Sequence, residues 1–424
     1  MFISKKIAWH DPLNLVQKII VNYQQNLVFL YSALWQQVEN SKSFLALFPI
    51  ETMMLKNFSQ LDVFLQNNQK TWFGYCSYEN VTDLENISFA CDYYIKTPTF
   101  FWQNFGLVLE FDHNKKKLLI KYQHQKYLDF ILECYKSDLP PSLKNLPKAQ
   151  NIATNLDKKQ YLQAILDIQH KISAGNLFQT NLTQKFYGLL NQNINHTSAF
   201  YLFAKLMQIS PANYASFAVF NETFVVSASP ELFLQAKNQQ VLSKPIKGTI
   251  ASKNNRQQDL EQQKILQNSS KDMSENLMIT DLMRNDLAKV CMVNSVLVPK
   301  LFELQSYKNL HHLVSTVSGK LAKKYNYGSL IKACFPPGSM TGAPKLEAIK
   351  VAHQYEQQHR GIYSGCLGFI AKNRLNLAVV IRTLILQQNQ FEFQAGGGIT
   401  SASDPLQEFM EVEVKSSALQ ELLS

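Results

Sequence analysis

The chain has 424 residues, of which 46% are hydrophobic and 17% are charged, so it is long enough to bury a large core and to form two or three domains. Its formal net charge is +10, but Lys and Arg are spread along the chain, and no zinc motif or RNP-type motif accompanies them. We therefore expect no nucleic-acid partner, whereas a basic surface suits an anionic substrate.

The first 150 residues are expected to form a sheet-rich region. Aromatic and β-branched residues gather there in short runs, such as Trp72–Tyr75 and Phe100–Trp102, and these residue types favour strands. Lys115–Lys117 separate two apolar runs, a pattern that predicts a solvated hairpin turn.

A change in composition marks a boundary near residue 150. Prolines and several Lys and Asn residues between Ser137 and Asp157 disfavour both helix and strand. We therefore expect a linker there and divide the chain into residues 1–150 and 151–424. Asp157 can then N-cap a helix whose apolar residues recur every three or four positions up to Gly175.

Beyond this helix, strand-like runs alternate with helical patterns. The strand-like runs are Tyr214–Phe220, Leu367–Ala371 and Leu375–Leu386. The helical patterns are Asp259–Gln267, Asp272–Met283, Leu346–Gln357 and Pro405–Leu423, the last with Asp404 as its N-cap. The sequence predicts a fold that mixes α and β elements.

The cysteines and the apolar segments indicate the cellular compartment of the protein. The six cysteines are widely spaced, without a C-x-x-C pair or a His cluster at metal-ligand spacing. Residues 1–13 lack an apolar core of signal-peptide length, and no run reaches the ~18 apolar residues of a membrane span. We expect a cytoplasmic protein that does not interact with a membrane.

Glu231 and Lys247 form the first candidate pair. Glu231 follows Pro230 after the strand-like segment 224–226, and Lys247 lies between a proline and a glycine. A carboxyl group and an amine on neighbouring rigid loops are suited to act as acid and nucleophile. Spacing alone, however, favours the alternative that both are surface charges in turns.

Two pairs of carboxylates predict a divalent-metal site. Asp272 and Glu275 are three residues apart, as are Glu408 and Glu411, and Lys415 follows on the same helix face. Mg²⁺ prefers one or two carboxylates together with waters and substrate oxygens. Either pair considered alone is better explained as a solvated helix face.

Arg382 and two glycine-containing segments are candidates for anion binding. Pro337–Lys345 leads into a predicted helix whose free N–H groups suit an anion, and Ala395–Thr400 follows a strand and lets a ligand approach the backbone. Neither matches a nucleotide-binding motif. Arg382 lies inside the apolar run 378–384, which predicts a largely buried strand. A guanidinium group on such a strand requires a paired anion, from either a ligand or a protein carboxylate.

Taken in order, these segments resemble the chorismate-binding enzymes, a family that includes anthranilate synthase component I, aminodeoxychorismate synthase component I, isochorismate synthase and salicylate synthase. The resemblance covers about residues 155–424. The matching segments are Gln179–Leu182, Ser229–Glu231, Pro245–Thr249, Glu275–Ile279, Asp281–Asp286, His312–Ser315, Pro337–Lys345, Arg360–Gly365, Ile381–Thr383, Ala395–Thr400 and Glu408–Lys415. It implies an α+β fold of the anthranilate synthase component I type, in which large β-sheets pack as a sandwich with helices outside.

The resemblance also implies a role for each matched residue. Glu275 and Glu411 would bind Mg²⁺ directly, Asp272 and Glu408 would hold its waters, and the metal would bind the ring carboxylate of chorismate. Glu231 would protonate the departing C4 hydroxyl. The substrate's carboxylates would be held by Arg382, Tyr363, Lys415 and the Gly396 and Gly397 backbone. The resemblance also places His312 and Thr249 in the lining of the same pocket.

Lys247 distinguishes among the family members. Anthranilate synthases carry alanine at the matching position, whereas aminodeoxychorismate synthases carry lysine. A neutral lysine amine can attack C2 as the C4 hydroxyl leaves, after which ammonia attacks C4 and expels the lysine. The resemblance thus implies amination of chorismate at C4 for para-aminobenzoate and folate synthesis. Anthranilate synthase is the alternative activity, and a lysine that only pairs with the substrate is the alternative role.

A separate partner is implied as the source of ammonia. Cys366 lies in Ser364–Gly368, which matches a different motif from that of a glutaminase nucleophile. We therefore expect a separate glutamine amidotransferase subunit. A Leu-Leu-Glu-Ser segment of the kind that binds tryptophan in feedback-regulated anthranilate synthases is also missing, which argues against tryptophan regulation.

Overall fold

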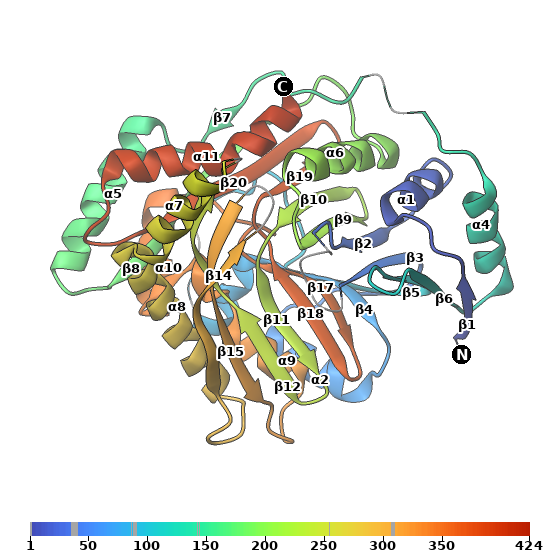
Figure 1. Ribbon diagram of the computed structural model, residues 1–424, viewed down its shortest axis with the longest axis horizontal. Helices are drawn as coiled ribbons and strands as arrows, with labels where there is room; N and C mark the ends of the chain where they lie inside the picture. The colour runs from blue at the N-terminus through green and yellow to red at the C-terminus, as the bar shows by residue number, and fades with distance from the viewer. Residues whose placement is uncertain are drawn as a thin grey trace.

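The strands form a continuous antiparallel network that folds into two layers with helices on the outside (Figure 1). The computed structural model describes residues 2–34, 41–85, 87, 91–141, 143, 145–253, 255–306 and 310–424. This architecture confirms the expected α+β fold with packed sheets and outer helices.

The first layer runs from β8 at one edge to β1 at the other. Its strands, in order of pairing, are β8 (Gln179–Leu189), β20 (Gln390–Ile399), β19 (Thr383–Gln387), β10 (Thr223–Ser229), β9 (Tyr214–Phe220), β2 (Leu27–Tyr31), β3 (Lys42–Met53), β5 (Phe100–Asp112), β6 (Lys117–Tyr122) and β1 (Ile3–Ile7). The short strands β7 (Ala153–Thr154) and β16 (Gly342–Ala343) also pair with β8.

The second layer begins at β5, which pairs with β4 as well as with β3 and β6. Its further strands, in order, are β4 (Trp72–Cys76), β17 (Cys366–Ala371), β18 (Arg374–Val379), β11 (Leu232–Lys237), β12 (Gln240–Lys244) and β15 (Leu310–Lys320), and β15 also pairs with β13 (Ile246–Ala251) and β14 (Leu297–Ser306). The long β5 therefore holds the two layers together.

Alternation along the strands builds separate cores on the two faces of each layer. On β10, Val225 packs in the core between the layers, whereas Phe224 and Val226 pack under the outer helices. On β17, Leu367 faces inward and Cys366 faces outward. The core between the layers is rich in aromatic residues, whose rings pack between the two sheets.

Helices cover both outer faces (Figure 1). The first layer is covered by α1 (Pro12–Ile20), α4 (Gln125–Lys136), α5 (Lys158–Ser173), α6 (His196–Ile209), α10 (Lys345–Glu356) and α11 (Pro405–Leu423). The second is covered by α2 (Phe58–Asn67), α8 (Ser270–Ala288) and α9 (Tyr327–Cys334). The helix α7 (Arg256–Gln267) lies beside β13, and α3 (Val81–Glu85) is short.

Several local predictions are confirmed. Asp157 N-caps α5 through a capping box, and Asp404 caps α11 at Pro405. The strand predicted over Tyr214–Phe220 is β9, and β5 and β6 form the predicted hairpin. These elements depend on short-range patterns and turn chemistry, which sequence records directly.

The strand predicted over Leu375–Leu386 is wrong, because two strands occupy this run. β18 pairs with β11 and β17 in the second layer, whereas β19 pairs with β10 and β20 in the first. The chain must cross between the layers at residues 380–382, and Arg382 takes a left-handed backbone conformation with φ of 50°. A uniformly apolar run conceals such a crossing.

Strands on the two sides of residue 150 pair directly, through β2 with β9 and β4 with β17. The division of the chain into residues 1–150 and 151–424 stays a prediction. In the part of the chain that the structure covers, no helix combines the length and the apolar character needed to cross a membrane.

Candidate active site

Lys247, Thr249 and His312 lie on adjacent strands of the second layer. Thr249 on β13 is directly opposite His312 on β15, and the Thr249 hydroxyl lies 2.8 Å from Nδ1 of His312. Lys247 Nζ lies 3.8 Å from Oε2 of Glu275 on α8. The sequence placed Lys247 on a loop, which is wrong, because Lys247 lies within β13 after the bend at Pro245. Ile246 and Thr249 on either side pair with β15, and the register shifts between them.

Glu231 occupies the predicted corner between β10 and β11, and it is buried. Burial raises the pKa of its carboxyl group from 4.5 to about 7, while the nearby Ser339 hydroxyl, Lys247 and Lys415 act in the opposite direction. The group is therefore about half protonated near neutral pH, as a general acid requires. The fold brings Glu231 and Lys247 into one neighbourhood, although the two strands β11 and β12 separate them in the sequence.

The four predicted metal-binding carboxylates lie on α8 and α11, two helices far apart in the sequence. Asp272 and Glu275 share α8, and Glu408 and Glu411 share α11. Glu408 is buried and accepts hydrogen bonds from Ser403 Oγ at 2.8 Å and from Lys271 Nζ at 2.7 Å. Lys271 also interacts electrostatically with Glu275 and Glu411, so the two helices present their acidic faces to a common region.

The local charges perturb the acidic groups in different directions. Burial raises the pKa of Glu275, Lys247 and Lys271 counteract this, and Glu408 adds to it. For Glu411, burial opposes ionisation, but the Lys415 ammonium 2.6 Å away helps to hold the pKa below its usual value. Lys247, Lys271 and Lys415 thus partly neutralise the negative charge of these carboxylates.

The donor set fits an oxygen-seeking divalent cation in its chemistry. The candidate ligands are carboxylates, and the glycines of β20 leave space beside them: a Cβ on Gly397 would lie 2.8 Å from Glu408 Oε2, and one on Gly398 would lie 3.3 Å from Glu275 Oε2. Within the described ranges, however, no three His, Cys, Asp or Glu side chains are grouped so that they could hold a metal. The lysine pairs would have to part before these oxygens could converge.

Arg382 has the character of an anion-binding group. Its half-buried side chain carries a pKa lowered by burial, and none of the acidic residues that the structure describes pairs with it. Burial and the charge of Arg382 lower the pKa of His312 to about 3, so the imidazole is neutral. Of the two partners that the sequence allowed for Arg382, the geometry leaves room for a ligand carboxylate.

Tyr363, Lys415 and the glycine segment complete the predicted set. Tyr363 is buried in the turn before β17, and burial raises the pKa of its hydroxyl. Lys415 Nζ donates a hydrogen bond of 2.8 Å to the Gly396 carbonyl oxygen. The glycine segment was expected to follow a strand. That is wrong, because Gly396 and Gly397 lie inside β20 and pair with Thr183 and Leu182 of β8.

Four residues near the site were missed by the sequence analysis. Lys271 directly precedes Asp272, and Ser339 lies within the matched segment Pro337–Lys345, but nothing in the sequence shows which way their side chains point. Arg360 is buried and paired with Glu356, and it donates hydrogen bonds of 2.8 Å to the carbonyl oxygens of Met340 and Asn181. The amide oxygen of Gln179 is buried, and no described group hydrogen-bonds it. Both Arg360 and Gln179 lie in segments that carried the family resemblance.

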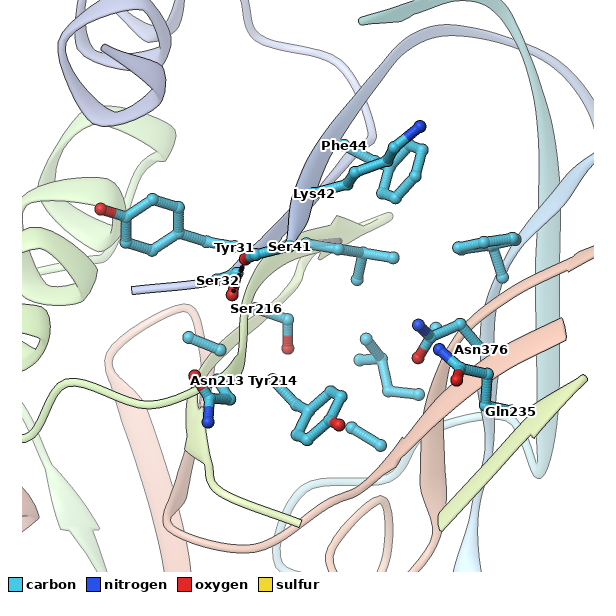
Figure 2. Close-up of a pocket in the computed structure, with 16 residues that line it drawn as sticks. Tyr31, Ser32, Ser41, Lys42, Phe44, Asn213, Tyr214, Ser216, Gln235 and Asn376 are labelled. Carbon is cyan, nitrogen blue, oxygen red and sulfur yellow. Dashed lines mark hydrogen bonds between the residues drawn. The ribbon is translucent and has the colours of Figure 1, made fainter. Parts of the chain in front are cut away.

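Two pockets adjoin this region. The first opens between the layers and is lined by Tyr31, Phe44, Tyr214, Gln235 and Asn376, with Gln235 and Asn376 close together on paired strands (Figure 2). None of the predicted site residues lines it.

The second pocket contains His312 and Arg382 next to Pro230, and it shares Asn213 with the first. A cavity therefore lies against His312 and Arg382, and Glu231 and Lys247 are not among the residues that line it.

Comparisons with known proteins point to the same class of enzyme. Residues 14–421 match the family described as "chorismate binding enzyme". The chain is 34% identical to aminodeoxychorismate synthase component 1 of Escherichia coli over 61% of this chain and 56% of that protein. It is 36% identical to anthranilate synthase component 1 of Saccharolobus solfataricus over 62% of each. Among solved structures, anthranilate synthase component I of Streptococcus pneumoniae superposes with a TM-score of 0.79 at 25% identity, covering 90% of this chain and 92% of that one.

Proposed function

This chain belongs to the chorismate-binding enzyme family, and from that premise we propose that it converts chorismate and ammonia to 4-amino-4-deoxychorismate. The ammonia would come from glutamine through a separate glutaminase subunit, and the product would serve para-aminobenzoate and folate synthesis. The match spans little more than half the length of the E. coli relative, and the reaction, the substrates and the partner are proposed together.

Lys247 is the observation that carries the proposal. Its amine faces Glu275 at 3.8 Å, and its charge acts on the buried Glu231. A lysine in the middle of a chorismate site offers a nucleophile that an alanine there cannot supply. The presence of both the Lys247 amine and the Glu231 carboxyl group supports a covalent route to C4.

The proposed reaction needs one acid and one nucleophile. The neutral amine of Lys247 forms a bond to C2 while the bond from C4 to its hydroxyl oxygen breaks, and Glu231 donates a proton so that water leaves. Ammonia then bonds to C4, and the bond from C2 to the lysine nitrogen breaks. The net change is chorismate plus ammonia to 4-amino-4-deoxychorismate plus water, and proton return restores both side chains.

The remaining residues would bind and orient the substrate. Arg382, which no described carboxylate neutralises, suits a substrate carboxylate. The neutral His312 lines the pocket beside it and lies 2.8 Å from the Thr249 hydroxyl. We propose that Mg²⁺, when bound by Glu275 and Glu411 with Asp272 and Glu408 behind them, supplies positive charge for the ring carboxylate.

The source of the ammonia and the cellular location are part of the same proposal. The relatives named component 1 imply a second component, which we take to be the glutaminase. Cytoplasmic location accords with the six cysteines, all of which are free thiols.

Anthranilate synthase is the second candidate. A relative with this name is as similar as those named aminodeoxychorismate synthase, at 36% identity. That activity would release pyruvate and give a fluorescent aromatic product, and it needs no lysine nucleophile. The position of Lys247 favours the first candidate.

Product identification separates the two. The purified chain should convert chorismate, Mg²⁺ and ammonium to 4-amino-4-deoxychorismate, detected by chromatography and mass spectrometry. Anthranilate as the main product would refute the proposal. Lys247→Ala should abolish the C4-aminated product, whereas Lys244→Ala, on the neighbouring strand β12, serves as the matched control and should retain it.

A further inference from the structure

Lys271 has no part in the proposed reaction, yet its ammonium group lies among the proposed metal ligands. We propose that Lys271 is a built-in counter-ion that competes with the divalent cation, so that the cation binds only when this side chain turns away from Glu408. The inference rests on the proposed metal site.

The contacts of Lys271 reach both acidic helices. Its Nζ lies 2.7 Å from Glu408 Oε1 on α11, and it interacts electrostatically with Glu275 on its own helix and with Glu411. A single ammonium thus faces carboxylates that would otherwise repel one another. A cation bound directly by Glu275 and Glu411, and through its waters by Glu408, would have to take over the same carboxylates.

The Lys271 and Glu408 side chains differ in how far each can move. The Glu408 side chain is 1% exposed and is held by Ser403, whereas the Lys271 side chain is 42% exposed. Glu408 therefore stays in place while Lys271 can turn into solvent, where water solvates its ammonium group. The other oxygen of Glu408, Oε2, faces the space beside Gly397, and no described hydrogen bond reaches it.

Charge balance favours exchange over simultaneous occupation. The cluster holds four carboxylates and three lysines, which leaves one negative charge in excess. The lysines are Lys247, Lys271 and Lys415, and the first and third have proposed roles toward the substrate. With Lys271 turned away, a divalent cation makes the cluster formally neutral; with Lys271 in place, it leaves a positive excess.

Binding of Mn²⁺ to the full-length protein without chorismate tests the inference. Mn²⁺ stands in for Mg²⁺, and calorimetry or electron paramagnetic resonance measures its affinity. Lys271→Met removes the ammonium group and keeps much of the aliphatic chain, so it should tighten Mn²⁺ binding by about fivefold, which corresponds to about 1 kcal/mol. Lys271→Arg keeps the charge and should bind as the unaltered protein does.

Lys289→Met is the matched control. Lys289 follows the same helix and pairs at 2.8 Å with Asp286, another buried carboxylate, but it lies outside the cluster. Its loss should leave Mn²⁺ affinity unchanged. Thermal unfolding gives a second readout: Lys271→Met should lower the unfolding midpoint without metal, because Glu408 loses its partner, and Mn²⁺ should raise that midpoint more than in the unaltered protein.

Each outcome is decisive. Tighter binding in Lys271→Met alone supports the inference, as does binding that appears only in this variant. Equal or weaker binding in folded Lys271→Met overturns it while leaving the metal site standing. Absence of Mn²⁺ binding in every variant overturns the metal site itself, and the inference with it.

Discussion

Replacing Glu231 with Gln should make the protein more stable at alkaline pH and nearly inactive. Folded Glu231 keeps its proton up to a pKa of about 7, whereas an unfolded carboxyl group releases it near 4.5. Between these pH values the folded state holds more protons than the unfolded state, so this group costs stability as the pH rises. Gln is neutral at every pH, and the variant escapes that cost.

The magnitude follows from the shift. A change from 4.5 to about 7 corresponds to about 3 kcal/mol once the pH exceeds 7, and to nothing below 4.5. Glu231 is only 5% exposed, so solvent screens little of this effect. Without an acid for the leaving hydroxyl, kcat should fall by about 10²- to 10⁴-fold.

Urea unfolding at pH 5, 6, 7 and 8 measures the stability difference, and product formation from chorismate measures the activity. Glu222→Gln, in the exposed turn between β9 and β10, is the control and should change neither quantity. A Glu231→Gln protein whose stability advantage does not grow between pH 5 and pH 8 would refute the account of burial. Full activity in that variant would refute the role as acid.

Three further substitutions test other parts of the site. Arg382→Met should raise the KM for chorismate by at least about tenfold in steady-state kinetics, because a ligand carboxylate loses its partner, and Arg382→Lys should restore only part of this. Arg360→Met should lower the free energy of unfolding in urea by about 3–5 kcal/mol, because Glu356 is left buried and unpaired. Gly397→Ala should weaken Mn²⁺ binding with an unchanged circular dichroism spectrum, because the new Cβ would meet Glu408 Oε2 at 2.8 Å.

An unchanged KM, unfolding energy or Mn²⁺ affinity would contradict the corresponding expectation. Arg284→Met is the control for the stability measurement, since Arg284 and Asp281 form an ion pair in which both side chains are more than half exposed. Its loss should cost less than about 1 kcal/mol.

Local sequence patterns predicted much of the fold that lies near each residue. The cap at Asp157, the start of α11 at Pro405 and the strand Tyr214–Phe220 were all recognisable, because capping, proline geometry and alternation act over a few residues. The crossing at Arg382 was not recognisable. Both sides of it are buried apolar strands, and the partners that separate them lie in different layers.

The composition of the candidate site was largely visible in the sequence, but its geometry was not. The resemblance to the family implied acid, nucleophile and metal chemistry for Glu231, Lys247, Glu275 and Glu411, whereas their spacing alone favoured solvated surface charges. Lys271 illustrates what was missing, because its ion-pair partner Glu408 lies 137 residues further along the chain, on α11.

The sequence by itself therefore determined which chemical groups this protein carries and which family of folds receives them. Tertiary structure decided how those groups act on one another: which carboxyl group is buried away from water and keeps its proton, which guanidinium pairs with none of the described carboxylates, and which ammonium lies against the buried Glu408. Burial and charge separation depend on distances between segments that are remote in the chain, and no pattern along the chain measures those distances.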